Sequence, residues 1–175
     1  MTANGDHPNF AKYIRAISLG CGIDGGEFNL QSDSEIADPS SAGRFAVGFG
    51  SIAHGTHAHW LLVQLERDSS DWTLHSCALT EVRSDRDDAV VVLDVRGSGV
   101  CAVGGWLAPP AHTLRVTFGD RQTEAAISNR VALLTSSPSL PTAARLHTEV
   151  LDRDGHRLAD LSHSGLRDLG VSYQR

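Results

Sequence analysis

Leu114-Arg115-Val116-Thr117-Phe118-Gly119-Asp120 opens the stretch of sequence that decides the fold, which continues to Leu158. Every second side chain from Leu114 to Phe118 is apolar, and successive side chains of a β-strand point to opposite faces. One face of this segment is therefore predicted to be core. Gly119 and Asp120 tolerate positive φ angles, so they predict a tight reversal into a second strand.

The rest of this stretch repeats the pattern. Asn129-Arg130 marks another reversal, and Asp152-Arg153-Asp154-Gly155 is typical of a type I turn closed by a left-handed glycine. Leu146, Thr148 and Val150, which precede this turn, are predicted to share one face. The closely spaced turns leave no room for crossover helices, so we expect the strands to pair antiparallel.

Upstream of this stretch, from residue 44 onward, short β-prone segments also alternate with turn residues. Val90-Val91-Val92-Leu93 is one such segment. Another, His57 to Leu65, is largely apolar on both faces, so it is predicted to be a central strand covered on each side. The regular spacing of these signals predicts nine or ten strands in an all-β, antiparallel, immunoglobulin-like β-sandwich of two facing layers.

Residues 1–43 differ from the rest, because they are rich in Gly, Ser, Asp and Asn and have only brief apolar runs. We interpret them as a loosely structured N-terminal extension or linker, and residues 44–175 as the β-sandwich domain. Asn9 is predicted to cap one short helix that ends at Gly20, since apolar side chains recur between them at three- and four-residue steps. A short strand is considered only at Phe28 to Leu30.

Length and charge limit the classes of function. A chain of 175 residues is long enough for one domain with a substantial core. Its net charge of −6 and its lack of a basic cluster argue against nucleic-acid binding. No segment approaches the roughly 20 apolar residues that span a bilayer, and Met1 to Leu19 lacks the apolar run of a signal peptide. The sequence therefore predicts a cytoplasmic protein with no membrane span, and it leaves homo-oligomer formation open.

One motif suggests a cofactor. Gly48-Phe49-Gly50-Ser51-Ile52-Ala53 matches the G-x-G-x-x-A turn that binds dinucleotides. That interpretation requires a helix across residues 51–65, but this segment contains Gly55 and three histidines and lacks a 3.6-residue apolar stripe. We therefore interpret the match as fortuitous and expect no dinucleotide cofactor.

His54, His57 and His59 form the only dense cluster of metal-ligating side chains in the sequence. Histidines two positions apart on a strand project from the same face, and His54 can reach them through a turn at Gly55. Three imidazoles are the protein ligands of one type of zinc site, which keeps a fourth position for water. The alternative is that these histidines lie half exposed at the rim of the sandwich, bonded to backbone or water. Candidates for a further ligand are His75, His112, Glu66 and Asp71.

Trp60, Trp72 and Trp106 are candidate ligand-binding residues, because an indole offers a large flat face with a single hydrogen-bond donor. Tryptophans on strands also commonly pack in the core, and the sequence does not decide between the two roles. The chain has no G-x-S-x-G elbow, and no base is signalled for Cys101 as a nucleophile. The sequence thus predicts no catalytic residue, although it leaves enzymatic activity undecided.

The sequence resembles immunoglobulin-like β-sandwich modules of uncharacterised actinobacterial extracytoplasmic proteins in three segments: Gly105 to Pro110, Leu114 to Asp120 and Leu151 to Gly155. The resemblance covers about residues 72–162 and rests on strand rhythm and turn residues. It implies a cysteine pair, for which Cys77 and Cys101 occupy comparable places. A bridge between them would add about 3 kcal/mol of stability. In a reducing cytoplasm it would not persist, and both would then be small buried side chains.

Two functions follow from these observations. The first is a non-catalytic binding or assembly module for a protein partner or a small ligand, because no acid/base pair, nucleophile motif or cofactor loop is found. The second is a metal-binding or metal-dependent protein of the zinc type that uses His54, His57 and His59.

Overall fold

The structure of the protein, a computed structural model, describes residues 8–20, 22–23, 27–37, 44–68, 71–83, 90–97, 100–136, 146–163 and 171–173. These residues form a short N-terminal helix, α1 (Phe10–Gly20), and three antiparallel sheets of four strands each. The expectation of a mostly β, antiparallel protein with one short N-terminal helix is confirmed.

The strands of each sheet follow one another in space in the order β1–β2–β3–β4, β12–β5–β6–β9 and β11–β10–β7–β8. Sheet A contains β1 (Phe28–Ala37), β2 (Arg44–His54), β3 (His57–Asp68) and β4 (Asp71–Arg83). Sheet B contains β12 (Val171–Tyr173), β5 (Val90–Gly97), β6 (Val100–Leu107) and β9 (Val131–Ser136). Sheet C contains β11 (Arg157–His163), β10 (Leu146–Leu151), β7 (Thr113–Phe118) and β8 (Arg121–Ala126). Each strand expected after residue 44 corresponds to one of β2–β11, whereas β12 was not expected.

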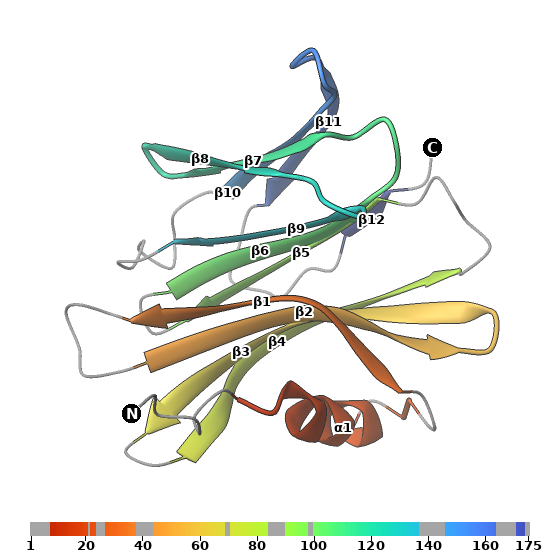
Figure 1. The fold of residues 1–175 in the computed structure, drawn as a ribbon, viewed down its shortest axis with the longest axis vertical. Coiled ribbons are helices and arrows are strands. Elements are labelled where there is room, and N and C mark those ends of the chain that lie inside the picture. The colour runs from red at the N-terminus through yellow and green to blue at the C-terminus, as the bar shows by residue number, and fades with distance from the viewer. Residues whose placement is uncertain are drawn as a thin grey trace, which may run out of the picture.

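The sheets are stacked, and α1 lies on the outer side of sheet A (Figure 1). The order of layers is α1, sheet A, sheet B and sheet C, and three apolar clusters fill the spaces between them. The strand β3 therefore has core on both faces, as predicted. Leu61 and Val63 face α1, whereas Trp60 and Leu62 face sheet B.

Sheet B is the central sheet, because the apolar side chains of β5 point alternately to both of its neighbours. Val91 and Leu93 belong to the cluster shared with sheet A, and Val92 belongs to the cluster shared with sheet C. A strand buried on both faces needs no polar positions, which explains the nearly continuous apolar run of this segment. Fully burying each such side chain stabilises the fold by about 1.5–3 kcal/mol.

The number of layers corrects one expectation. The sequence predicted two facing layers, whereas the structure has three sheets, because β7, β8, β10 and β11 form a sheet of their own on sheet B. Leu114, Val116 and Phe118 do form one buried face, as predicted. Alternation along a strand shows which side chains are buried, but it does not show which sheet they meet.

The reversals predicted from turn residues are present. Gly119 and Gly155 have φ angles of 63° and 83°, and Asn129 and Arg130 have φ angles of 50° and 68°. Glycine enters this left-handed region without steric penalty, and asparagine tolerates it better than most residues. These turns set the register of the hairpins in sheet C and the start of β9.

The N-terminal segment takes part in the fold through α1 and β1. The buried side chains Phe10, Ile14 and Ile17 of α1 cover one face of sheet A. The strand β1 pairs with β2 along its length, with a bulge next to Leu30. It is longer than the short strand that the sequence suggested, because an edge strand with exposed and half-buried side chains needs no apolar alternation.

Candidate functional site

The three histidines singled out from the sequence lie at the β2–β3 hairpin, at one end of sheet A. His54 ends β2, His57 begins β3, and the two are directly opposite each other in the ladder. Gly55 makes the turn with a φ of 59°. Residues paired across strands project to the same face, as does His59, two positions further along β3. All three imidazoles therefore project to the face of sheet A that α1 covers elsewhere.

Glu81 of β4 joins these histidines, which the sequence did not predict. It lies directly opposite His59 in the β3–β4 ladder. Its Oε2 is 3.1 Å from Nε2 of His59, and its Oε1 is 3.5 Å from Nε2 of His57. One carboxylate thus bridges two imidazoles. We call His54, His57, His59 and Glu81 together the histidine face.

His59 is the more enclosed of the two histidines on β3. Its side chain is 12% exposed, against 41% for His57. Its Nδ1 atom is buried and has no hydrogen-bond partner. The ring of His54 lies nearby, with 6.4 Å between the two ring centroids. Because an unsatisfied buried polar atom costs about 1–3 kcal/mol, a ligand at this nitrogen would stabilise the fold.

The residues considered as a further ligand lie elsewhere. Nδ1 of His75 is 3.2 Å from Oε2 of Glu66. The backbone N–H of His112 donates to the carbonyl of Leu151, beside sheet C. The structure therefore places Glu81, and not these residues, next to the three histidines. Whether the histidines bind a metal stays a prediction.

The three tryptophans do not share one surface. Trp60, 7% exposed, stacks on Phe49 at 5.2 Å between ring centroids and lies 5.4 Å from the ring of Trp106. The guanidinium of Arg130 lies over the Trp106 ring, 5.2 Å from its centroid. Trp72 is on the helix side of sheet A, where its carbonyl accepts a hydrogen bond from the hydroxyl of Tyr13. Trp60 and Trp106 thus pack between sheets A and B, and a ligand-binding role for the tryptophans stays a prediction.

The two cysteines considered as a pair lie in different layers. Cys77 packs beside the cluster between α1 and sheet A, whereas Cys101 belongs to the cluster between sheets B and C. Sheet A and a whole apolar cluster separate the two positions. The structure therefore does not form the Cys77–Cys101 bridge that the resemblance implied, and both thiols are free.

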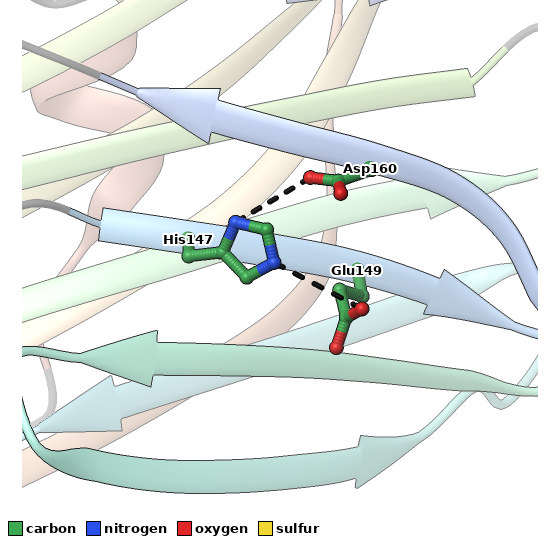
Figure 2. Close-up of side chains that lie close together, drawn as sticks. All are labelled: His147, Glu149 and Asp160. Atoms are coloured by element: carbon green, nitrogen blue, oxygen red, sulfur yellow. Dashed lines mark ion pairs between the residues drawn. The ribbon is translucent and has the colours of Figure 1, made fainter.

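A second cluster of ionisable side chains lies on the face of sheet C that points away from sheet B (Figure 2). His147 and Glu149 belong to β10, and Asp160 of β11 is directly opposite Glu149. Nδ1 of His147 is 3.4 Å from Oδ1 of Asp160, and its Nε2 is 3.9 Å from Oε1 of Glu149. One ligand atom from each of the three lies within 4.8 Å of the others.

Two arginines extend this cluster into a charge row across sheet C. Nε of Arg115 is 2.6 Å from Oε1 of Glu124, and its Nη1 is 3.4 Å from Oε2 of Glu149. Nη1 of Arg157 is 2.8 Å from Oδ2 of Asp160 and 3.6 Å from Oε1 of Glu149. Three carboxylates thus face two guanidinium groups. One proton on the neighbouring imidazole balances these charges, whereas a divalent cation would leave an excess of positive charge.

A third group, Asp152, Asp154 and His156, lies in the turn between β10 and β11. Oδ1 of Asp152 accepts hydrogen bonds from the backbone N–H of His156 at 2.8 Å and of Asp154 at 2.9 Å. The bond from His156 contributes most to lowering the pKa of the Asp152 carboxyl. This carboxylate already closes the turn, so we assign no ligand to it.

No family model, curated protein or solved structure matched the chain. Within the part of the chain that the structure describes, no helix is long and apolar enough to cross a membrane. A function for this protein therefore rests on the arrangement of its own side chains.

Proposed function

We propose that this protein is a non-catalytic binding or assembly module, an immunoglobulin-like stack of antiparallel sheets that meets a protein partner through the outer face of sheet C. The charge row is the observation that carries the proposal. It runs across all four strands of sheet C, where Glu124, Arg115, Glu149 and Asp160 stand side by side in the ladder. None of the described elements covers this face.

Stability alone does not account for the charge row. Ion pairs between exposed side chains typically contribute only about 0–1 kcal/mol. Charges held in place on paired strands can instead steer a partner and select its orientation, because little ordering is left to do on binding. The row thus supplies specificity more than folding energy.

The mixture of signs favours a protein partner. A surface that binds nucleic acid or an anionic membrane needs an excess of basic groups, because it must neutralise phosphates. The charge row holds more carboxylates than guanidinium groups, and the whole chain carries a net charge of −6. A protein surface with its own alternating charges complements such a row.

The immunoglobulin-like part of the proposal is supported by the segments that carry the resemblance. Gly105 to Pro110 covers the end of β6, Leu114 to Asp120 covers β7 and its turn, and Leu151 to Gly155 covers the turn after β10. Turns of this kind connect antiparallel strands at the ends of sandwich domains.

The test is a partner capture with two charge reversals of equal kind. Arg115→Glu breaks the charge row, whereas Arg121→Glu changes an exposed arginine opposite Phe118, whose side of sheet C faces sheet B. Immobilised full-length chain is exposed to lysate of the source organism, and the bound proteins are quantified by mass spectrometry at low and high salt.

One protein retained by the wild type and by Arg121→Glu, and reduced at least tenfold by Arg115→Glu and by high salt, would support the proposal. A protein retained equally by both variants, or none retained by the wild type, would contradict it. Circular dichroism checks that both variants remain folded.

A further inference from the structure

We propose that the histidine face binds one divalent transition-metal ion of the class of Zn²⁺, Ni²⁺ and Cu²⁺. His54, His57 and His59 supply imidazoles, and Glu81 orients them. This site is on the helix side of sheet A, at the opposite end of the stack from the outer face of sheet C. The inference is therefore independent of the proposed protein partner.

The residue types select the class of metal. Imidazole nitrogen suits zinc, copper and nickel, whereas calcium and magnesium prefer sites built from several oxygens. Three neighbouring strands, β2, β3 and β4, each contribute to the histidine face, so the backbone positions are fixed by ladder hydrogen bonds. A rigid base of this kind is what a metal site requires.

His59 and Glu81 already have the arrangement of a ligand and its supporting carboxylate. Nε2 of His59 is 3.1 Å from Oε2 of Glu81, so a neutral ring carries its proton on Nε2 and donates it to the carboxylate. Nδ1 then holds a lone pair, and this is the buried nitrogen that has no hydrogen-bond partner. Metal-bound histidines commonly bond their other nitrogen to a carboxylate in this way.

His54 is placed to share the ion with His59. Two imidazoles that bind one ion through nitrogens about 2.0–2.1 Å away have ring centroids roughly 5–6.5 Å apart. The observed separation of 6.4 Å is at the upper end of this range, with 59° between the ring planes. Only a small rotation of the exposed His54 side chain is needed to bring both nitrogens to one ion.

His57 supplies the third imidazole at the exposed end of the hairpin. Its Nδ1 is 3.2 Å from the hydroxyl oxygen of Thr56, and its Nε2 is 3.5 Å from Oε1 of Glu81. Arg83, directly opposite His57, adds positive charge to this rim. Neutral imidazoles bind a metal without needing a surplus of negative charge, so an exposed guanidinium weakens the site without abolishing it.

The experiment titrates untagged, full-length protein, first dialysed against a chelator, with ZnCl₂ in a calorimeter. One ion per chain is expected, and CaCl₂ under the same conditions is expected to give no binding. His59→Ala and His54→Ala should each weaken zinc binding at least tenfold. Glu81→Gln should weaken it about 10–100-fold, as the loss of a supporting carboxylate does elsewhere. The matched control is His147→Ala, which removes a histidine from sheet C and should leave zinc affinity unchanged.

Two results would overturn the inference: wild-type protein that binds no zinc, or zinc binding that survives His59→Ala and His54→Ala and is lost in His147→Ala. Because His54 is exposed, its replacement should leave the fold intact and carries the test if His59→Ala does not fold. A Cu²⁺-loaded sample gives a second readout, since nitrogen couplings in its electron paramagnetic resonance spectrum should diminish in His54→Ala.

Discussion

The ring of Phe10 packs directly on Gly48: a Cβ placed on Gly48 would lie 2.7 Å from two carbons of the ring. Phe10 is the first residue of α1, and Gly48 is within β2, so this contact joins the helix to sheet A. The missing side chain at Gly48 is what lets the helix approach the sheet so closely. The glycines of this segment thus serve packing, and not the binding of a dinucleotide.

Gly48→Ala is expected to lower the free energy of unfolding by about 1–3 kcal/mol, because the added methyl group requires the buried Phe10 ring and its helix to move. Urea unfolding followed by circular dichroism measures the change. The control is Gly20→Ala at the end of α1, where a Cβ meets no atom within 4 Å. Equal stability of the two variants would show that α1 does not rest on Gly48.

Ile14→Ala is expected to cost about 2–5 kcal/mol, because it leaves a cavity between α1 and sheet A. Ile14 is 1% exposed, whereas Leu19 on the same helix is 62% exposed. Leu19→Ala should therefore change the stability by less than about 0.5 kcal/mol. The same urea unfolding experiment compares them. If both variants are as stable as the wild type, residues 10–20 are not part of the cooperative fold.

The strands of this protein could be predicted from its sequence because period-two alternation and turn residues are local signals. Leu114, Val116 and Phe118 are buried as predicted, and the left-handed glycines are where the turns required them. The strand β1 was underestimated, since its polar side chains at the edge of sheet A need no apolar pattern. The split into three sheets depends on long-range packing, which no local pattern encodes.

Half of the histidine face was equally predictable, and half was not. The spacing of His57 and His59 on a strand is enough to place them on one face. Regular pairing from the β3–β4 turn would have put Thr80 opposite His59, but a bulge after Gln64 shifts the ladder by one residue and brings Glu81 there. A shift of one residue exchanges the two faces of a strand, so the carboxylate could not be assigned from spacing alone.

The charge row on sheet C has only a weak signal in the sequence. The polar residues His147 and Glu149 alternate with buried residues on β10, which is typical of any strand with one side facing solvent. Their partners Arg115 and Asp160 come from distant parts of the chain. Only the antiparallel register of β10 with β7 and β11 shows that these charges form one row.

Cys101 is expected to resist chemical modification in the folded protein. Burial raises the pKa of its thiol from the ordinary value of 9.0 to about 12, an effect that nearby Arg96 reduces and Asp94 increases. Because only the thiolate is reactive, Cys101 should stay unmodified by iodoacetamide at pH 8.5 and react fully in urea. Site-resolved mass spectrometry measures the labelling. Labelling of the native protein at the rate found in urea would contradict the burial of this thiol.

The same shift predicts how stability depends on pH. A thiol whose pKa is raised on folding favours the folded state fully below the pKa of the unfolded chain, near 9.0, and this contribution is lost as the pH rises toward about 12. Cys101→Ala removes the contribution along with the thiol. The variant is expected to be less stable than the wild type at pH 7, because it leaves a small cavity between sheets B and C. The difference should narrow between pH 9 and pH 11, measured by urea unfolding, and a constant difference would show that the thiol ionises equally in both states.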